Sequence, residues 1–208
     1  MPQFPILAQK TALLFFDALN MYLHPEDDAA SKAVEASGVV AAMQKINRAC
    51  RSAGIAVFYA QADHRPDHRD FAPHIVDRGH RQTSEAPYLT EPPAAVSGSW
   101  AAGIIPELAP EAGDYIIKKH RWSAFYQTHL ELSLRTAGID TIMLAGGSTE
   151  VGVASTAYAA RDRNFNLIVL RDACRSGRKG VDAFFAEHVF PVFGRVMTVD
   201  QVITAIEG

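Results

Sequence analysis

The chain alternates short apolar runs with longer amphipathic segments. Six runs are apolar almost throughout and partly β-branched, which is typical of strands that are covered on both faces. They span residues 11–16, 55–61, 115–117, 141–145, 166–170 and 195–198. Apolar residues at helical spacing lie between them, over residues 30–53, 129–136, 150–163, 183–189 and 199–206.

Strands that alternate with helices in this way predict a parallel sheet with helices on both faces. We therefore expect an α/β fold, a Rossmann-like three-layer α/β/α arrangement around a six-stranded, mainly parallel sheet. The 208 residues are expected to form a single domain over residues 1–208. Residues 62–110 break the alternation and hold seven of the eleven prolines, which is typical of a functional loop or a subunit contact.

Composition and charge narrow the choice of partners. Hydrophobic residues make up 48% and charged residues 21%, as in folded globular domains. The net charge of -3 argues against a nucleic-acid or anionic-membrane partner, and no apolar run reaches the roughly 18 residues of a membrane span. Two cysteines make neither a disulfide framework nor a cysteine-based zinc site, and we find no signal peptide, so we expect a cytoplasmic protein.

Ligands of open α/β sheets bind beyond the carboxyl ends of the strands, which directs attention to the residues that follow the runs. Asp17 follows the first run, where burial could raise its pKa and a nearby cation lower it, making it a proton donor or acceptor. The alternative is a turn or N-cap residue that begins the loop toward Asn20. Lys118 and Lys119 follow the third run; alternation should send one of them into the cleft, unless both are solvated surface lysines.

The fourth run leads into Gly146 and Gly147 and then into Ser148, which is suited to cap the next helix. The amino end of that helix offers N–H groups to an anion or an oxyanion. Gly152 falls in its first turn, where glycine costs about 1 kcal/mol relative to alanine. Either a ligand or tight helix–sheet packing would explain this glycine. The segment lacks the GxGxxG dinucleotide fingerprint.

Three pieces of the sequence together resemble the isochorismatase-like hydrolase superfamily, also called the cysteine hydrolases. The first piece is the apolar run LLFFD of this chain, which ends in Asp17. The second is residues 119–125, which match the family pattern K-x-R-x-S-A-F. The third is residues 146–157, which follow a strand and correspond to the family pattern G–x–x–T–x–x–C–V–x–x–T–A. The resemblance covers about residues 11–172. It implies that Asp17 and Lys119 flank the position of the family's nucleophile, that Lys118 faces away, and that the chain forms a homodimer or homotetramer.

The family's nucleophile is a cysteine, and Gly152 stands at that position here. The thioester route of the family's amidases needs a thiolate. Ser148 and Ser155 do not occupy the motif position, and Cys174 is expected to pack as a small buried residue. The resemblance offers another chemistry, because the isochorismatases of siderophore and phenazine pathways also carry glycine there and cleave a vinyl ether.

On this interpretation Asp17 delivers a proton to the enol-ether carbon, and water then adds to the oxocarbenium ion. Lys119 binds the substrate carboxylate or steadies the charge of Asp17, and Gly152 leaves room for the substrate. Further substrate contacts are expected at the start of the helix, from Gly147, Ser148 and Val151.

Residues 63–82 hold four each of His, Arg and Asp, and three interpretations stay open. Nicotinamidases of the superfamily bind a metal through Asp-x-His and a later His, but Asp63-His64-Arg65 lacks that spacing. We therefore expect no metal and no cofactor. A solvated, charge-paired loop is the second interpretation. In the third, Arg69 or His64 reaches an anionic substrate together with Gln61.

Three functions remain in view. The leading one is a metal-independent hydrolase without a covalent intermediate, acting on a small carboxylate-bearing substrate, with an isochorismate-type vinyl ether as the expected example. The second is a catalytically silent relative that binds a metabolite or serves as a subunit. The third is an amidohydrolase whose cysteine has been replaced.

Overall fold

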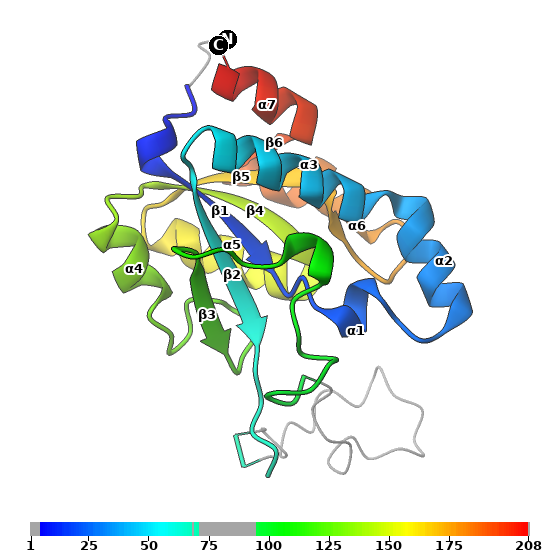
Figure 1. The fold of residues 1–208 in the computed structure, drawn as a ribbon. Coiled ribbons are helices and arrows are strands. Elements are labelled where there is room, and N and C mark those ends of the chain that lie inside the picture. The colour runs from blue at the N-terminus through cyan, green and yellow to red at the C-terminus, as the bar shows by residue number, and fades with distance from the viewer. Residues whose placement is uncertain (1–4, 68, 71–94, 208) are drawn as a thin grey trace.

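The computed structural model describes residues 5–67, 69–70 and 95–207. Six strands form one sheet in the order β3-β2-β1-β4-β5-β6, and each neighbouring pair is parallel (Figure 1). The expected α/β fold is confirmed, with a sheet that is parallel throughout. The strands are β1 (Thr11–Phe16), β2 (Ala56–Ala62), β3 (Tyr115–Lys119), β4 (Thr141–Gly147), β5 (Asn166–Arg175) and β6 (Arg195–Met197).

Helices cover both faces of the sheet, with α3 and α7 over one face and α4 and α5 over the other (Figure 1). None of the helices in the described ranges is long and apolar enough to cross a bilayer. The α-helices are α1 (Asn20–Leu23), α2 (Asp28–Ser37), α3 (Val39–Ser52), α4 (Leu130–Thr136), α5 (Ala154–Asp162), α6 (Val181–Phe184) and α7 (Val199–Glu207). Short 3₁₀ or π segments are η1 (Ala8–Lys10), η3 (Pro106–Leu108), η4 (Thr149–Val153), η5 (Phe185–Val189) and η6 (Phe190–Val192).

The central strand β1 explains why the first apolar run is continuous. All six of its residues are buried, and successive side chains of a strand point to opposite faces. Leu13 and Phe15 join the core beneath α3 and α7, whereas Leu14 and Phe16 join the core beneath α4 and α5. A strand with a core on each side needs apolar residues at every position.

Residues 30–53 and the fifth strand differ from the sequence prediction. Residues 30–53 form α2 and α3 in place of one helix, because Gly38 between them has a φ of +67°, a conformation that ends helices and favours glycine. β5 continues beyond residue 170 to Arg175, after a register shift against β4 between Leu144 and Gly146. The polar residues from Arg171 onward hid this extension from the apolar pattern.

β1 and β4 lie side by side at the centre of the sheet, and the strands that follow each of them run toward opposite edges. Open α/β sheets bind ligands at such a point, beyond the carboxyl ends of the strands. Asp17 follows β1 there, and β4 ends in Gly146 and Gly147. Of the irregular segment 62–110, residues 68 and 71–94 lie outside the described residues.

Candidate functional site

Asp17 and Lys119 form a buried ion pair at the carboxyl ends of β1 and β3. The Nζ atom of Lys119 lies 2.8 Å from Oδ2 of Asp17, and these side chains are 5% and 7% exposed. The backbone N–H of Ala62 donates to Oδ1 of Asp17 at 2.8 Å. Lys118 points the other way, with its Nζ 3.2 Å from Oδ1 of Asp63 and its side chain 48% exposed. Alternation along β3 thus sends Lys119 inward and Lys118 outward, as predicted.

Both the backbone and the surroundings of Asp17 are unusual. Its φ of +45° is rarely adopted by residues other than glycine and costs about 1–3 kcal/mol. Burial raises the pKa of Asp17 above its ordinary value, although Lys119 and the N–H of Ala62 act to lower it. The side chain caps no helix, since α1 begins after Leu19 without a side-chain cap. Asp17 is therefore placed to hold and exchange a proton.

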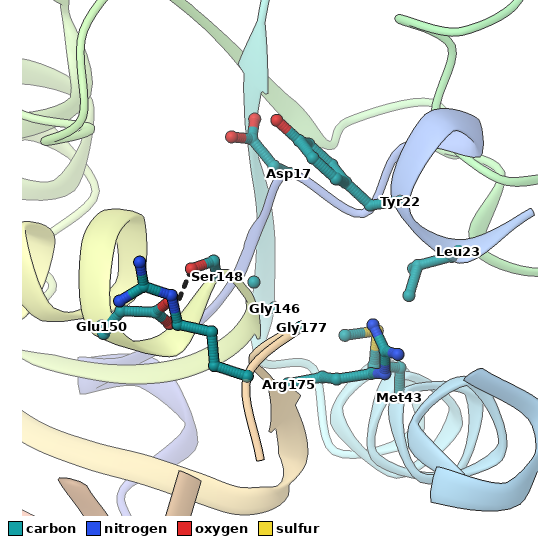
Figure 2. A pocket seen from close by; sticks show the side chains of 11 residues that line it. Asp17, Tyr22, Leu23, Met43, Gly146, Ser148, Glu150, Arg175 and Gly177 are labelled. Atoms are coloured by element: carbon teal, nitrogen blue, oxygen red, sulfur yellow. Dashed lines mark hydrogen bonds and ion pairs between the residues drawn. The ribbon is translucent and has the colours of Figure 1, made fainter. Parts of the chain in front are cut away.

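A cavity of about 370 Å³ opens beside Asp17. Its walls come from the ends of β1, β4 and β5 and from α1 and α3 (Figure 2). The Tyr22 hydroxyl faces the carboxylate of Asp17 (Figure 2), and burial together with this carboxylate raises the pKa of Tyr22 to about 12. Tyr22 therefore stays protonated near neutral pH and can donate a hydrogen bond into the cavity.

Two acidic and two basic side chains line the cavity, and three of these four have a charged partner. Oε1 of Glu150 lies 3.9 Å from Nε of Arg178, and Asp17 is paired with Lys119. Arg175 also lines the cavity, and its guanidinium makes no hydrogen bond or ion pair with any residue that the structure describes. Arg175 therefore offers the cavity a guanidinium without a partner among the described residues, and such a group can bind an anionic group such as a carboxylate.

Gly152 lies in η4, and the ring of Phe16 fills the space beside it. A Cβ built on Gly152 would lie 2.0, 2.4 and 2.7 Å from Cε1, Cζ and Cδ1 of Phe16, far inside the carbon–carbon contact distance of about 3.5–4.0 Å. Packing therefore accounts for this glycine. The space that we expected to be left for the substrate is occupied by Phe16, and Gly152 does not line the cavity.

The three side chains that could replace the missing cysteine, Ser148, Ser155 and Cys174, are not activated nucleophiles. Ser148 donates a hydrogen bond to Glu150 at 2.7 Å; burial acts to raise the pKa of Glu150, but hydrogen bonds from Ser148 and the backbone hold it below its ordinary value, so Glu150 is a weak base. Ser155 donates to the carbonyl of Gly152 at 3.1 Å. Cys174 is 7% exposed, and burial raises the pKa of its thiol, as expected for a packed cysteine.

The isochorismatase domain matches residues 11–201. The chain belongs to the isochorismatase family. It is 30% identical over 204 residues to ureidoacrylate amidohydrolase RutB of Methylobacterium radiotolerans, covering 94% of this chain and 79% of that one. It is 43% identical over 93 residues to the isochorismatase family protein YecD of Escherichia coli O157:H7, covering 45% of this chain and only half (50%) of YecD. A cysteine hydrolase structure from Pseudomonas syringae pv. phaseolicola 1448A has a TM-score of 0.81 and 26% identity, covering 99% of this chain and 96% of that one.

Family membership confirms the resemblance seen in the sequence and the assignment to isochorismatase-like hydrolases. The sequence brought Asp17 and Lys119 together correctly, and it placed Gly147 and Ser148 at the cavity, where the structure has them. The peptide bond between Gly147 and Ser148 is cis. Tyr22 and Arg175 were missed, along with Glu150 and Arg178 of the cavity wall. For Arg175 the available signal was the polar continuation of the fifth apolar run.

Three residues that we expected to contact substrate do not line the cavity of this isochorismatase-family chain. The side-chain amide of Gln61 donates to a backbone carbonyl at 2.7 Å and is buried. Arg69 is exposed on the loop after β2. The N–H of Val151 donates to the carbonyl of Ser148 at 3.2 Å, so it is used within η4 and is not offered to a substrate oxygen.

His64, Asp70 and His120 form a cluster next to the ion pair. Their nitrogen and oxygen ligand atoms all lie within 4.8 Å of one another; Oδ2 of Asp70 is 3.5 Å from Nδ1 of His64 and 3.2 Å from Nδ1 of His120. Imidazole and carboxylate groups are ligands for zinc and other transition metals. These three residues could hold a metal ion, and the expectation that the chain binds none stays a prediction.

Proposed function

We propose that this protein is a hydrolase that uses Asp17 as a general acid–base on a small carboxylate-bearing substrate, without a covalent intermediate. The observation that carries the proposal is the buried Asp17–Lys119 pair beside the cavity, together with the Phe16 ring that fills the space beside Gly152, where the family has its nucleophile. A vinyl ether of the isochorismate type is the substrate that this chemistry suits best.

In the proposed reaction the Asp17 carboxyl gives its proton to the enol-ether carbon. Water then adds to the resulting oxocarbenium ion and returns a proton to Asp17. The hemiketal formed in this way collapses to pyruvate and the ring alcohol, so that one water is consumed overall. Burial favours the protonated form of Asp17, which starts the cycle. Lys119 stabilises the carboxylate of Asp17 after the proton has been transferred.

The guanidinium of Arg175 supports an anionic substrate. Arg175 lines the cavity, and its guanidinium has no hydrogen-bond or ion-pair partner among the residues that the structure describes. A guanidinium binds a carboxylate through two parallel hydrogen bonds. The neutral hydroxyl of Tyr22 is a further donor on the Asp17 side of the cavity.

An amidohydrolase is the second candidate, and it is favoured by the relatives. RutB, whose similarity covers 94% of this chain, is named as a ureidoacrylate amidohydrolase. With glycine at position 152 an amide would have to be attacked directly by water that Asp17 activates. The third possibility, a silent binding protein, predicts stabilisation by a carboxylate ligand without turnover.

The test is a comparison of two products. Purified protein is given isochorismate and ureidoacrylate separately, and pyruvate and ammonia are measured. Rapid acid quench followed by mass spectrometry of the intact protein detects any bound intermediate. Pyruvate without a mass increase is the expected result. Release of ammonia from ureidoacrylate without any pyruvate would show that the protein is an amidohydrolase. If neither pyruvate nor ammonia is formed, the silent binding protein is the remaining candidate.

A further inference from the structure

We propose that Phe16 is a positioning residue for Asp17: its ring takes the volume of the missing side chain at position 152 and keeps water away from the Asp17–Lys119 pair. This inference rests on the acid–base role proposed for Asp17. Phe16 would act on the reaction only through the state of that carboxyl group, without touching the substrate.

Two glycines make room for Phe16. In the parallel pairing of β1 with β4, Phe16 lies opposite Gly146, and a Cβ on Gly146 would lie 2.0 Å from the carbonyl oxygen of Phe16. On the ring side, a Cβ on Gly152 would lie within 2.7 Å of three ring atoms. Glycines before and after the cis peptide thus fit around one phenylalanine, whose ring has little room to move.

The same ring forms a wall of the ion pair. The Lys119 ammonium lies 4.3 Å from the centroid of the Phe16 ring and 2.8 Å from Asp17. Phe16 is only 2% exposed. The face of an aromatic ring attracts a cation, but it offers no hydrogen-bond donor to a carboxylate. The ring therefore packs against the ammonium of Lys119, the partner of Asp17, and excludes water from that side of the ion pair.

Loss of the ring should hydrate the pair. In Phe16→Val, neither Gly146 nor Gly152 has a side chain that could fill the space. A void that is bordered by charged groups takes up water, and water stabilises the ionised form of a carboxyl group. Asp17 would then ionise at lower pH and would be a poorer proton donor near neutrality.

The experiment is a titration of the Asp17 carboxyl by ¹³C NMR in the full chain and in two variants, Phe16→Val and Phe58→Val. Phe58 is the matched control, because it is fully buried in the same core cluster but stacks on Tyr115, with ring centroids 4.2 Å apart. We expect the Asp17 midpoint to fall by about one pH unit, a tenfold change in ionisation constant, in Phe16→Val and to stay unchanged in Phe58→Val. An unchanged midpoint in Phe16→Val, or an equal fall in both variants, would overturn the proposal.

The titration needs no turnover, so it separates this inference from the proposed function. If the wild-type chain releases no pyruvate but the midpoint still shifts in Phe16→Val, the function fails and the effect of Phe16 stands. Where turnover is measured, the fall of kcat/KM with rising pH should move to lower pH in Phe16→Val and not in Phe58→Val. If Phe16→Val does not fold, Phe16→Leu takes its place, with a shift in the same direction.

Discussion

Replacement of Gly152 by alanine should destabilise the fold, although alanine is the better helix former. The new Cβ would lie 2.0 Å from Cε1 of Phe16, so one of the two must shift by more than about 1 Å to reach normal contact. Overpacking of this kind costs about 1–3 kcal/mol, and helix propensity returns at most about 1 kcal/mol. A separation of only 2.0 Å from a ring atom places the cost at the upper end of this range, so the expected net loss is about 2 kcal/mol, or a fall in Tm of about 4–8 °C for a chain of this size.

Urea unfolding followed by circular dichroism measures this loss. Gly177→Ala is the control, because nothing lies within 4 Å of its added Cβ and its stability should stay within about 0.5 kcal/mol of wild type. Phe16→Leu in the Gly152→Ala background should recover part of the loss, since the smaller side chain admits the methyl group. Wild-type stability in Gly152→Ala, or strictly additive effects in the double variant, would refute the reasoning.

Further predictions concern the charges of the site. Lys119→Met leaves Asp17 buried without its cation and should cost about 3–5 kcal/mol in urea unfolding, whereas Lys118→Met should cost at most about 1 kcal/mol. The loss in the free energy of unfolding of Lys119→Met should be larger at pH 8 than at pH 5. Burial raises the pKa of Asp17 in the folded state. Stability that depends on a protonated carboxyl group is lost as the pH rises through that pKa. Arg175→Gln should raise KM for the carboxylate substrate about 10- to 100-fold by removing a charged hydrogen bond, while the exposed Arg171→Gln on the same strand should leave KM unchanged; a similar KM in both would remove Arg175 from the binding site.

The apolar pattern predicted the sheet because most of its strands are buried on both faces. A strand such as β1, with six buried residues, has no polar face that could obscure its limits. The same reasoning located Asp17, since a carboxylate directly after such a strand lies at the binding edge of the sheet. The inward direction of Lys119 followed from strand alternation, and the resemblance chose between it and Lys118.

The residues that the sequence missed depend on three-dimensional packing. The fifth apolar run ends at Leu170, but hydrogen bonding to β4 carries β5 on to Arg175, and only this extension brings a guanidinium to the cavity. The apolar pattern identified Phe16 only as one more core residue, because a linear sequence does not show that its ring lies against Gly152. Gln61 stands where a ligand-binding residue is expected at the end of a strand, yet its side-chain amide donates a hydrogen bond to a backbone carbonyl of a distant loop.

The most direct test of the account is pyruvate release from isochorismate by the wild-type chain and by Asp17→Asn. Asparagine keeps the shape of the side chain but cannot exchange a proton. The account predicts release by the wild type and a fall in kcat of about 10²–10⁴ in Asp17→Asn, with both proteins folded by circular dichroism. Equal release by the two proteins would contradict the central claim that Asp17 is the acid.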